Sequence, residues 1–252
     1  MSAASGFKDH FSGHSGGYAR ARPAYPGALF DFLASLPAEK GAAWECGAGS
    51  GQASRSLADR FRVVIATDAS AAQLTKATGA PGLLYVSAAA EHAPLRDGSV
   101  DLVAAAQALH WFDLPAFCAE AARLARPGAV LAAWCYGNCR VAPAFDHAYD
   151  RLYGEILGEY WPPERALVED GYRSLPLPFP SLAAPAFTME TEWDLTAMLD
   201  YLGTWSAAQY YRKAKGGDPL DSVRDEMARA WGDPSLRRRV VWPLSLRLAR
   251  IR

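Results

Sequence analysis

A glycine-rich segment at residues 45–51, ECGAGSG, has the composition of a ligand-binding turn. Gly47, Gly49 and Gly51 follow an apolar run and precede a helical one. Glycine lets the chain turn tightly and lets a ligand lie against the backbone, and the first N–H groups of the following helix are free to donate. Glu45 places a carboxylate two residues before the first glycine, which suits a ligand with a positively charged end.

The spacing of the glycines distinguishes two kinds of nucleotide site. In dinucleotide-binding proteins the turn reads G-x-G-x-x-G and places a pyrophosphate at the N-terminus of the helix. Here the third glycine comes one residue earlier, which gives G-x-G-x-G. Asp68 ends the next apolar strand, where a carboxylate can accept both hydroxyls of a ribose. One carboxylate that can bind a ribose and a second carboxylate that can lie near a positive charge together suit S-adenosylmethionine.

Short apolar strands alternate with helices between residues 42 and 134. Strands are expected at 42–46, 63–67, 83–86, 100–106 and 129–134, with helices at 52–60, 70–78 and 114–125 between them. An earlier helix is expected to begin at Pro26 and to end before Pro37. Because the strands are apolar throughout, we predict an α/β fold with a buried parallel sheet. The glycine turn and Asp68 then lie at the carboxyl ends of its strands, where ligands bind in such sheets.

The alternation stops after residue 137. Residues 140–185 are rich in aromatic residues and proline, and we predict that they form a cap insertion. An alternating strand is expected at 187–193, followed by helices at about 195–204 and 219–231 and a last strand at 242–251. Residues 1–25 show no period and are predicted to form an N-terminal arm.

The composition excludes several classes of protein. Half of the 252 residues are hydrophobic, which excludes a disordered chain. With 26 basic and 27 acidic residues the net charge is −1, which gives no general attraction to nucleic acid or to anionic membranes. The chain has no apolar run of about 18 residues and no apolar signal-peptide core, so we expect a cytoplasmic protein without a membrane partner. The four cysteines lack the spacing of a disulfide framework or a zinc site, and no metal is expected.

Several motifs occur together in the alternating region. They are the glycine turn at 45–51, IATDAS at 65–70, AEHAPL at 90–95, DGSVDLV at 97–103 and LARPG at 124–128. In this combination residues 41–134 resemble the class I S-adenosylmethionine-dependent methyltransferases. The segments YARARPAYP at 18–26, QALHWF at 107–112 and LDYLGTWS at 199–206 are similar to the branch that includes trans-aconitate methyltransferases, which methylate small molecules.

The resemblance implies a Rossmann-like class I methyltransferase fold. It predicts a seven-stranded, mostly parallel sheet whose last strand is antiparallel, within a single domain over residues 1–252. This domain would comprise an arm or lid at 1–25, a cofactor-binding core at 41–136, the cap insertion at 140–185 and the C-terminal part of the sheet at 186–252. The arm is expected to close over bound cofactor.

The resemblance also implies a set of site residues. Those expected to bind S-adenosylmethionine are Tyr18, Arg22, Glu45, Gly47, Ala48, Gly49, Gly51, Asp68, Ala69, Ala90, Glu91 and Gln107. Trp111, Tyr136 and Trp205 are expected to bind the acceptor. Many relatives carry an aspartate for the adenine amine at the position of Ala89, so here we expect that contact from the backbone at Ala90 and from Glu91.

His110 is the candidate catalytic residue. It follows the fourth expected strand, beside Trp111 and Phe112. At this position the histidine could either pack in the core or take part in the site. The expected reaction is methyl transfer to a small molecule, with S-adenosylhomocysteine as the second product. A carboxylate acceptor is ionised at neutral pH and needs no base, whereas a hydroxyl or amine acceptor would use His110 as its base. We favour a small carboxylic acid.

Three other functions stay open. A nicotinamide-dependent oxidoreductase would share the fold but should have the later third glycine. An RNA methyltransferase would use residues 212–252, which hold eleven basic and five acidic residues, but no RNA-binding module is recognisable there and no nucleic-acid partner is expected. A non-catalytic binding module would retain the glycine turn without the reaction. The sequence indicates no oligomeric state.

Overall fold

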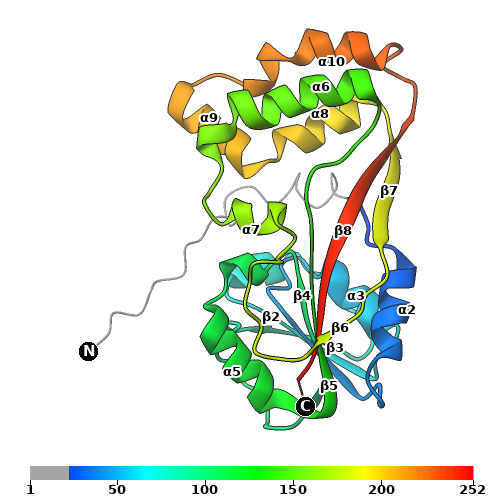
Figure 1. Cartoon of the computed structure of the whole chain (residues 1–252), viewed down its shortest axis with the longest axis vertical. Coiled ribbons are helices and arrows are strands. Elements are labelled where there is room, and N and C mark those ends of the chain that lie inside the picture. The colour runs from blue at the N-terminus through cyan, green and yellow to red at the C-terminus, as the bar shows by residue number, and fades with distance from the viewer. Residues whose placement is uncertain (1–22, 252) are drawn as a thin grey trace.

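A single twisted sheet forms the centre of the molecule (Figure 1). The computed structural model describes residues 23–251, in which eight strands pair in the order β3-β2-β1-β4-β5-β8-β6, with β7 also paired with β8. The strands are β1 Ala42–Cys46, β2 Val63–Asp68, β3 Leu83–Ser87, β4 Val100–Ala106, β5 Ala125–Tyr136, β6 Ser181–Leu182, β7 Phe187–Trp193 and β8 Arg238–Arg250.

The first five strands are parallel, and the last strand is antiparallel to β5. This confirms the predicted α/β Rossmann-like fold with a mostly parallel sheet and an antiparallel C-terminal strand. The predicted number of seven strands is wrong because β6, a pair of residues beside β8, makes an eighth. A two-residue strand is too short to leave a periodic pattern in the sequence.

Helices cover both faces of the parallel part of the sheet (Figure 1). Helices α2 (Gly27–Ser35) and α3 (Gln52–Ala58) pack against one face, and α5 (Leu114–Leu124) packs against the other, so that two hydrophobic cores lie on opposite sides of the strands. The predicted helix at 70–78 is shorter, since α4 spans only Ala71–Leu74. Strand β4 is buried from Val100 to Ala105, which explains why it is apolar apart from Asp101, whose carboxylate pairs with Arg126.

A second layer of helices lies beyond one end of the sheet (Figure 1). It contains α6 (Pro143–Arg151), α8 (Leu195–Gly203), α9 (Ser206–Lys215) and α10 (Arg224–Trp231), and α7 (Arg165–Glu169) lies between this layer and the sheet. The helical layer therefore includes more of the chain than the cap expected at 140–185. Its helices α8, α9 and α10 come from residues that we expected to belong with the sheet. Helix α9 was not predicted at all.

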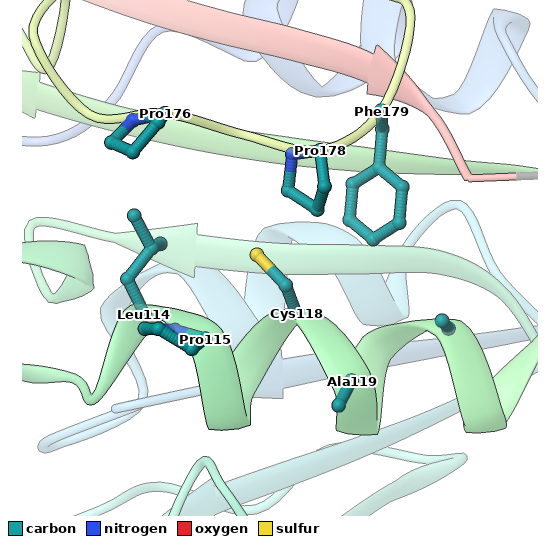
Figure 2. A pocket seen from close by; sticks show the side chains of 8 residues that line it. Leu114, Pro115, Cys118, Ala119, Pro176, Pro178 and Phe179 are labelled. Carbon is teal, nitrogen blue, oxygen red and sulfur yellow. The ribbon is translucent and has the colours of Figure 1, made fainter.

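An apolar groove of about 500 Å³ runs along the outer side of α5 (Figure 2). It lies between that helix and the segment that carries Pro176, Pro178 and Phe179, and none of its lining residues belongs to the predicted site. The four cysteines are buried and free, Cys118 in this groove among them. Among residues 23–251, none of the helices combines the length and apolar character needed to cross a bilayer.

Candidate functional site

The glycine turn between β1 and α3 needs glycine at two of its positions. Gly47 has φ of +68° and Gly51 has φ of +79°, in the left-handed region that other residues rarely adopt. A Cβ on Gly47 would lie 2.5 Å from the Cβ of Ala108, and one on Gly51 would overlap the hydroxyl of Tyr85. The N–H of Gly51 also donates to the carbonyl of Ala48 at 2.9 Å, which closes the turn.

Asp68 connects the end of β2 to this turn. Its Oδ2 accepts the N–H of Gly49 at 2.8 Å, and its Oδ1 accepts the N–H of Ser70 at 2.8 Å. Strands β1 and β2 pair in parallel up to Cys46 and Thr67, so their carboxyl ends lie side by side. The structure therefore brings together the two sequence features from which a nucleoside site was predicted. The exposed Ala69 follows directly.

Glu45 lies beneath the turn rather than on its surface. Its side chain is 1% exposed, and its carboxyl group accepts a hydrogen bond from the Ser54 hydroxyl of α3. Burial raises the pKa of Glu45 to about 8, the Ser54 bond opposes that rise, and the charge of Asp68 adds to it. At neutral pH this carboxyl is mainly protonated. We expected a charged group beside a positively charged ligand, and the structure has a buried group that supports the turn.

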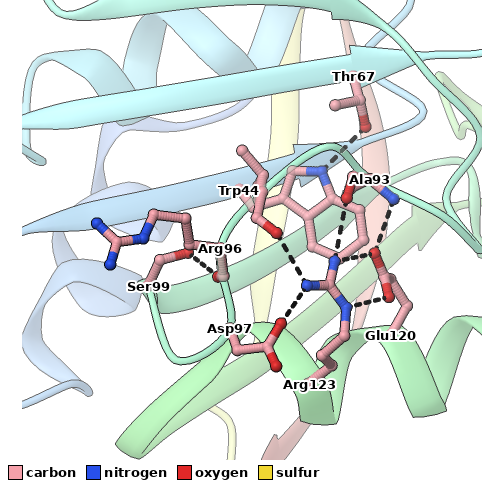
Figure 3. Close-up of polar contacts among 9 residues, drawn as sticks. Trp44, Thr67, Ala93, Arg96, Asp97, Ser99, Glu120 and Arg123 are labelled. Atoms are coloured by element: carbon pink, nitrogen blue, oxygen red, sulfur yellow. Dashed lines mark hydrogen bonds and ion pairs between the residues drawn. The ribbon is translucent and has the colours of Figure 1, made fainter.

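The loop after β3 carries the residues predicted to contact adenine. Ala90 is buried, and Glu91 uses its Oε1 to accept the N–H of Asp113 at 2.9 Å, at the start of α5. Arg123 of α5 holds the next part of the loop, donating to the carbonyls of Ala93 and Leu95 at 3.0 and 2.9 Å (Figure 3). The position of this loop is thus determined by contacts with α5.

Arg123 is itself held by two carboxylates. It donates to both oxygens of the buried Glu120, at 2.6 and 2.8 Å, and to Asp97 at 2.5 Å (Figure 3). The guanidinium lowers the pKa of Glu120. An arginine that bonds two carboxylates and two carbonyls fixes its neighbours through directed, charge-assisted bonds.

Gln107 and Tyr136 contact each other at the ends of β4 and β5. The Gln107 amide oxygen accepts the N–H of Tyr136 at 2.8 Å, and its amide nitrogen donates to the Tyr136 carbonyl at 3.2 Å. Gln107 has φ of +54°, and its own N–H donates to the carbonyl of Trp134 at 2.7 Å. Both ends of this amide are therefore used to fix the backbone where β5 leaves the sheet.

His110 lies in a single turn, η1 (Leu109–Trp111), just after β4. Its Nδ1 is 2.8 Å from the hydroxyl oxygen of Tyr172, and its ring lies 4.6 Å from that of Trp111. Burial, with a smaller contribution from the positive charge of Arg165, lowers the pKa of His110 to about 3. The imidazole is therefore neutral at every pH at which an enzyme normally works. The predicted site residues His110 and Trp111 are in contact.

Tyr172 is a partner of the candidate residue His110 that the sequence did not reveal. It is fully buried, its backbone has φ of +62°, and its carbonyl accepts a hydrogen bond from Arg247 of β8. A tyrosine in the left-handed region is uncommon and persists only where its surroundings hold it. Tyr172 lies 62 residues from His110 along the chain, in a stretch without a period, so no local signal pointed to it.

Comparisons with known proteins agree with this arrangement. Residues 44–133 match a family model described as a methyltransferase domain. A Dictyostelium discoideum protein described as a methyltransferase is 33% identical over 229 residues, which cover 89% of this chain and 87% of that protein. The chain belongs to the class I S-adenosylmethionine-dependent methyltransferases. An uncharacterised methyltransferase of Mycobacterium tuberculosis is 34% identical over 230 residues, covering 86% of this chain and 85% of that protein.

A solved structure from Anaeromyxobacter dehalogenans, described as a type II methyltransferase, shares this methyltransferase fold. It is 49% identical, with a TM-score of 0.87, and the match covers 91% of this chain and 98% of that one. The match extends beyond the residues that the family model covers. The helical layer and the antiparallel strands are thus part of a fold that a second methyltransferase shares.

Of the other predicted site residues of this methyltransferase, one lies in the helical layer and two fall outside the described part of the chain. Trp205 is buried in the helical layer, where its ring packs against Tyr149, Tyr153 and Trp161 at 5.3, 5.8 and 5.4 Å. Tyr18 and Arg22, with most of the predicted lid, lie outside the described residues. The part of the arm that is described begins at Pro23, whose carbonyl accepts the Gln52 amide of α3 at 2.7 Å.

Proposed function

We propose that this methyltransferase transfers the methyl group of S-adenosylmethionine to a small carboxylic acid, as in the trans-aconitate methyltransferase branch that its sequence resembles. The observation that carries the cofactor part of the proposal is the contact between Asp68 Oδ2 and the N–H of Gly49 at 2.8 Å, whereas the acceptor part rests on the resemblance. The contact brings a carboxylate and a glycine turn together at the carboxyl ends of β1 and β2. Parallel sheets of this kind bind nucleosides at that edge.

The residues at this edge fit S-adenosylmethionine. The Asp68 carboxylate, which accepts the N–H groups of Gly49 and Ser70, is the group that we assign to the hydroxyls of the ribose. Among residues 23–251, no heavy atom lies within 4 Å of a Cβ built on Gly49, so the described part of the chain leaves room for a ligand against the turn. We assign the other cofactor contacts to Gly47, Ala48, Gly51, Ala69, Ala90, Glu91 and Gln107, with Glu45 acting through Ser54 to support the turn.

The proposed reaction requires little acid–base catalysis from the protein. When bound, S-adenosylmethionine supplies a methyl group that its sulfonium has already activated. The residues of this chain then have to orient the acceptor and exclude water. A carboxylate acceptor is ionised at neutral pH, so no side chain has to remove a proton from it. A neutral His110 beside Trp111 and Tyr172 suits a residue that shapes the acceptor site.

Replacing His110 with glutamine tests the acceptor class. We expect His110→Gln to lower the transfer rate by about tenfold or less, because the imidazole contributes contacts but no proton transfer. Since the pKa of His110 is lowered to about 3, the rate of the wild type should show no histidine limb between pH 5.5 and 9. The measurement is transfer of labelled methyl from S-adenosylmethionine to a panel of mono-, di- and tricarboxylic acids, at several pH values, for both proteins.

A hydroxyl or amine acceptor makes the opposite prediction. In that case His110 acts as the base, and its replacement should cost about a hundredfold or more. A rate loss of that size in the His110→Gln variant would show that the carboxylic acid proposal is wrong. Phenols and amines added to the same panel supply the acceptors for that comparison.

The basic residues of the C-terminal segment favour a small molecule over RNA. Every arginine from 212 to 250 donates to a group of this chain: Arg212, Arg224 and Arg239 to carboxylates, and Arg229, Arg237, Arg238, Arg247 and Arg250 to main-chain carbonyls. Recognition of a nucleic acid would call for a basic stripe directed at phosphates. These contacts within the fold account for the local basic excess instead.

A further inference from the structure

Helix α7 places an arginine between the helical layer and the sheet (Figure 1). The side chain of Arg165 is only 17% exposed. Its helix contacts both β5 and the turn that carries His110, and its Nη2 donates to the amide oxygen of Asn138 at 3.2 Å, two residues after β5 ends. Arg165 therefore lies at the carboxyl edge of the sheet, on the side of His110.

Aromatic rings and neutral oxygens surround this guanidinium. Its carbon lies 4.9 Å from the ring centre of Trp161 and 5.4 Å from that of Tyr153, and its Nε donates to the Tyr153 hydroxyl at 2.8 Å. Within residues 23–251 its Nη1 has no hydrogen-bond partner. Guanidinium groups stack on aromatic rings and keep their in-plane donors available for carboxylates.

The charge of Arg165 is only partly compensated. The one carboxylate within 4 Å of it in the described chain is Glu169, whose Oε1 lies 3.9 Å from Nε. That oxygen accepts its hydrogen bond from the Tyr153 hydroxyl instead. A mostly buried cation is costly unless an anion pairs with it directly. By comparison, Arg123 makes direct bonds to two carboxylates.

We propose that Arg165 binds a carboxylate of the methyl acceptor and so positions the acceptor beside His110. This inference rests on the proposed function, because it assigns a residue to the acceptor of that reaction. The planar guanidinium group of an arginine matches the geometry of a carboxylate. The rings of Trp161 and Tyr153 would exclude water from that contact and thereby strengthen it.

Anion binding to the full chain, with and without S-adenosylhomocysteine, tests Arg165 directly. The probes are benzoate and succinate, with benzamide and succinamide as their neutral counterparts, each titrated calorimetrically. We expect the carboxylates to bind the wild type at least about tenfold more tightly than the amides, and Arg165→Gln to lose about tenfold or more of the carboxylate affinity. The affinity for S-adenosylhomocysteine should stay within about twofold, because Arg165 serves the acceptor.

Arg173→Gln is the matched control, since Arg173 pairs with Asp170 on the surface and is 79% exposed. It should bind every probe as the wild type does. Arg165→Lys keeps the charge but not the planar fork, so we expect intermediate affinity, and this variant replaces Arg165→Gln if the latter does not fold.

Equal binding of carboxylates and amides, or equal carboxylate affinity in the wild type and the Arg165 variants, would overturn the assignment. A wild type that binds carboxylates through Arg165 but does not bind S-adenosylhomocysteine would support this anion site and contradict the proposed function. The anion site at Arg165 and the proposed function can therefore be refuted independently of each other.

Discussion

Replacing Gly47 with alanine is expected to lower the free energy of unfolding by about 2–4 kcal/mol and to abolish cofactor binding. Two costs add. The backbone has φ of +68°, which an L-residue adopts at a cost of about 1–2 kcal/mol, and the new Cβ would lie 2.5 Å from that of Ala108. The contact forces either the turn or the start of η1 to move. Urea denaturation and titration with S-adenosylmethionine measure the two effects.

Gly49→Ala is the matched control, because its φ of +57° is similar but a Cβ there meets no heavy atom of the described residues within 4 Å. It should lose about 1–2 kcal/mol of stability, from the backbone conformation alone. If the two variants were equally stable, close packing against Ala108 would not be the reason for glycine at 47.

Replacing Glu45 with glutamine should change how stability depends on pH. Glu45 has its pKa raised from 4.5 to about 8, so the folded protein binds a proton that the unfolded chain has released. Stability therefore falls as pH rises from about 5 to about 8, by about 3–5 kcal/mol from this group. Glutamine stays neutral and can still accept the Ser54 hydrogen bond. The variant should match the wild type near pH 5 and exceed it by about 3–5 kcal/mol near pH 8.5.

The difference between the two proteins is the quantity to measure, because other groups titrate in the same range. His110, with its lowered pKa, makes the stability of both proteins rise with pH between about 3 and 6.5, and this effect cancels in the difference. Glu192→Gln, on the exposed face of β7, is the control and should show no such growth with pH. A Glu45→Gln difference that is constant from pH 5 to 8.5 would mean that Glu45 is ionised in the folded protein.

The parts of the fold that the sequence predicted are those with buried strands and clear turn chemistry. Strand β4 has the predicted bounds, because a strand covered on both faces is apolar at nearly every position, and here only Asp101 departs from that pattern. Helix α5 is close to prediction, and Asp113 caps it by accepting the N–H of Ala116 at 3.3 Å. The glycine turn was recognisable because its conformation allows few other residues.

Other elements of the fold have no comparably clear pattern in the sequence. Helix α9, whose sequence is SAAQYYRKAK, is largely polar, and its buried residues are the small Ala207 and Ala208. Its apolar stripe is therefore weak. Trp205 was expected in the acceptor site from a resemblance. Its ring packs against Tyr153 and Trp161, the two rings that also contact Arg165, so its place in the acceptor site stays a prediction. Which side of a helix meets which neighbour depends on tertiary packing.

The contents of the candidate site were predictable only in part. Asp68 and the glycine turn could be linked because consecutive parallel strands end at the same edge. The partner of His110, Tyr172, and the nearby cation Arg165 come from segments far along the chain and have no motif of their own. The raised pKa of Glu45 arises from burial, which a sequence position beside a turn does not reveal.

Binding of S-adenosylmethionine to the wild type, Asp68→Ala and Asp59→Ala, measured by calorimetry at pH 7.5, tests the central claim most directly. Asp59 is an exposed carboxylate at the end of α3 and serves as the control. We predict one site in the wild type, unchanged affinity in Asp59→Ala, and an affinity about tenfold to a hundredfold weaker in a folded Asp68→Ala, whose ribose hydroxyls would lack a charged acceptor. A wild type that does not bind S-adenosylmethionine, or an Asp68→Ala variant that binds it as tightly as the wild type, would contradict the account.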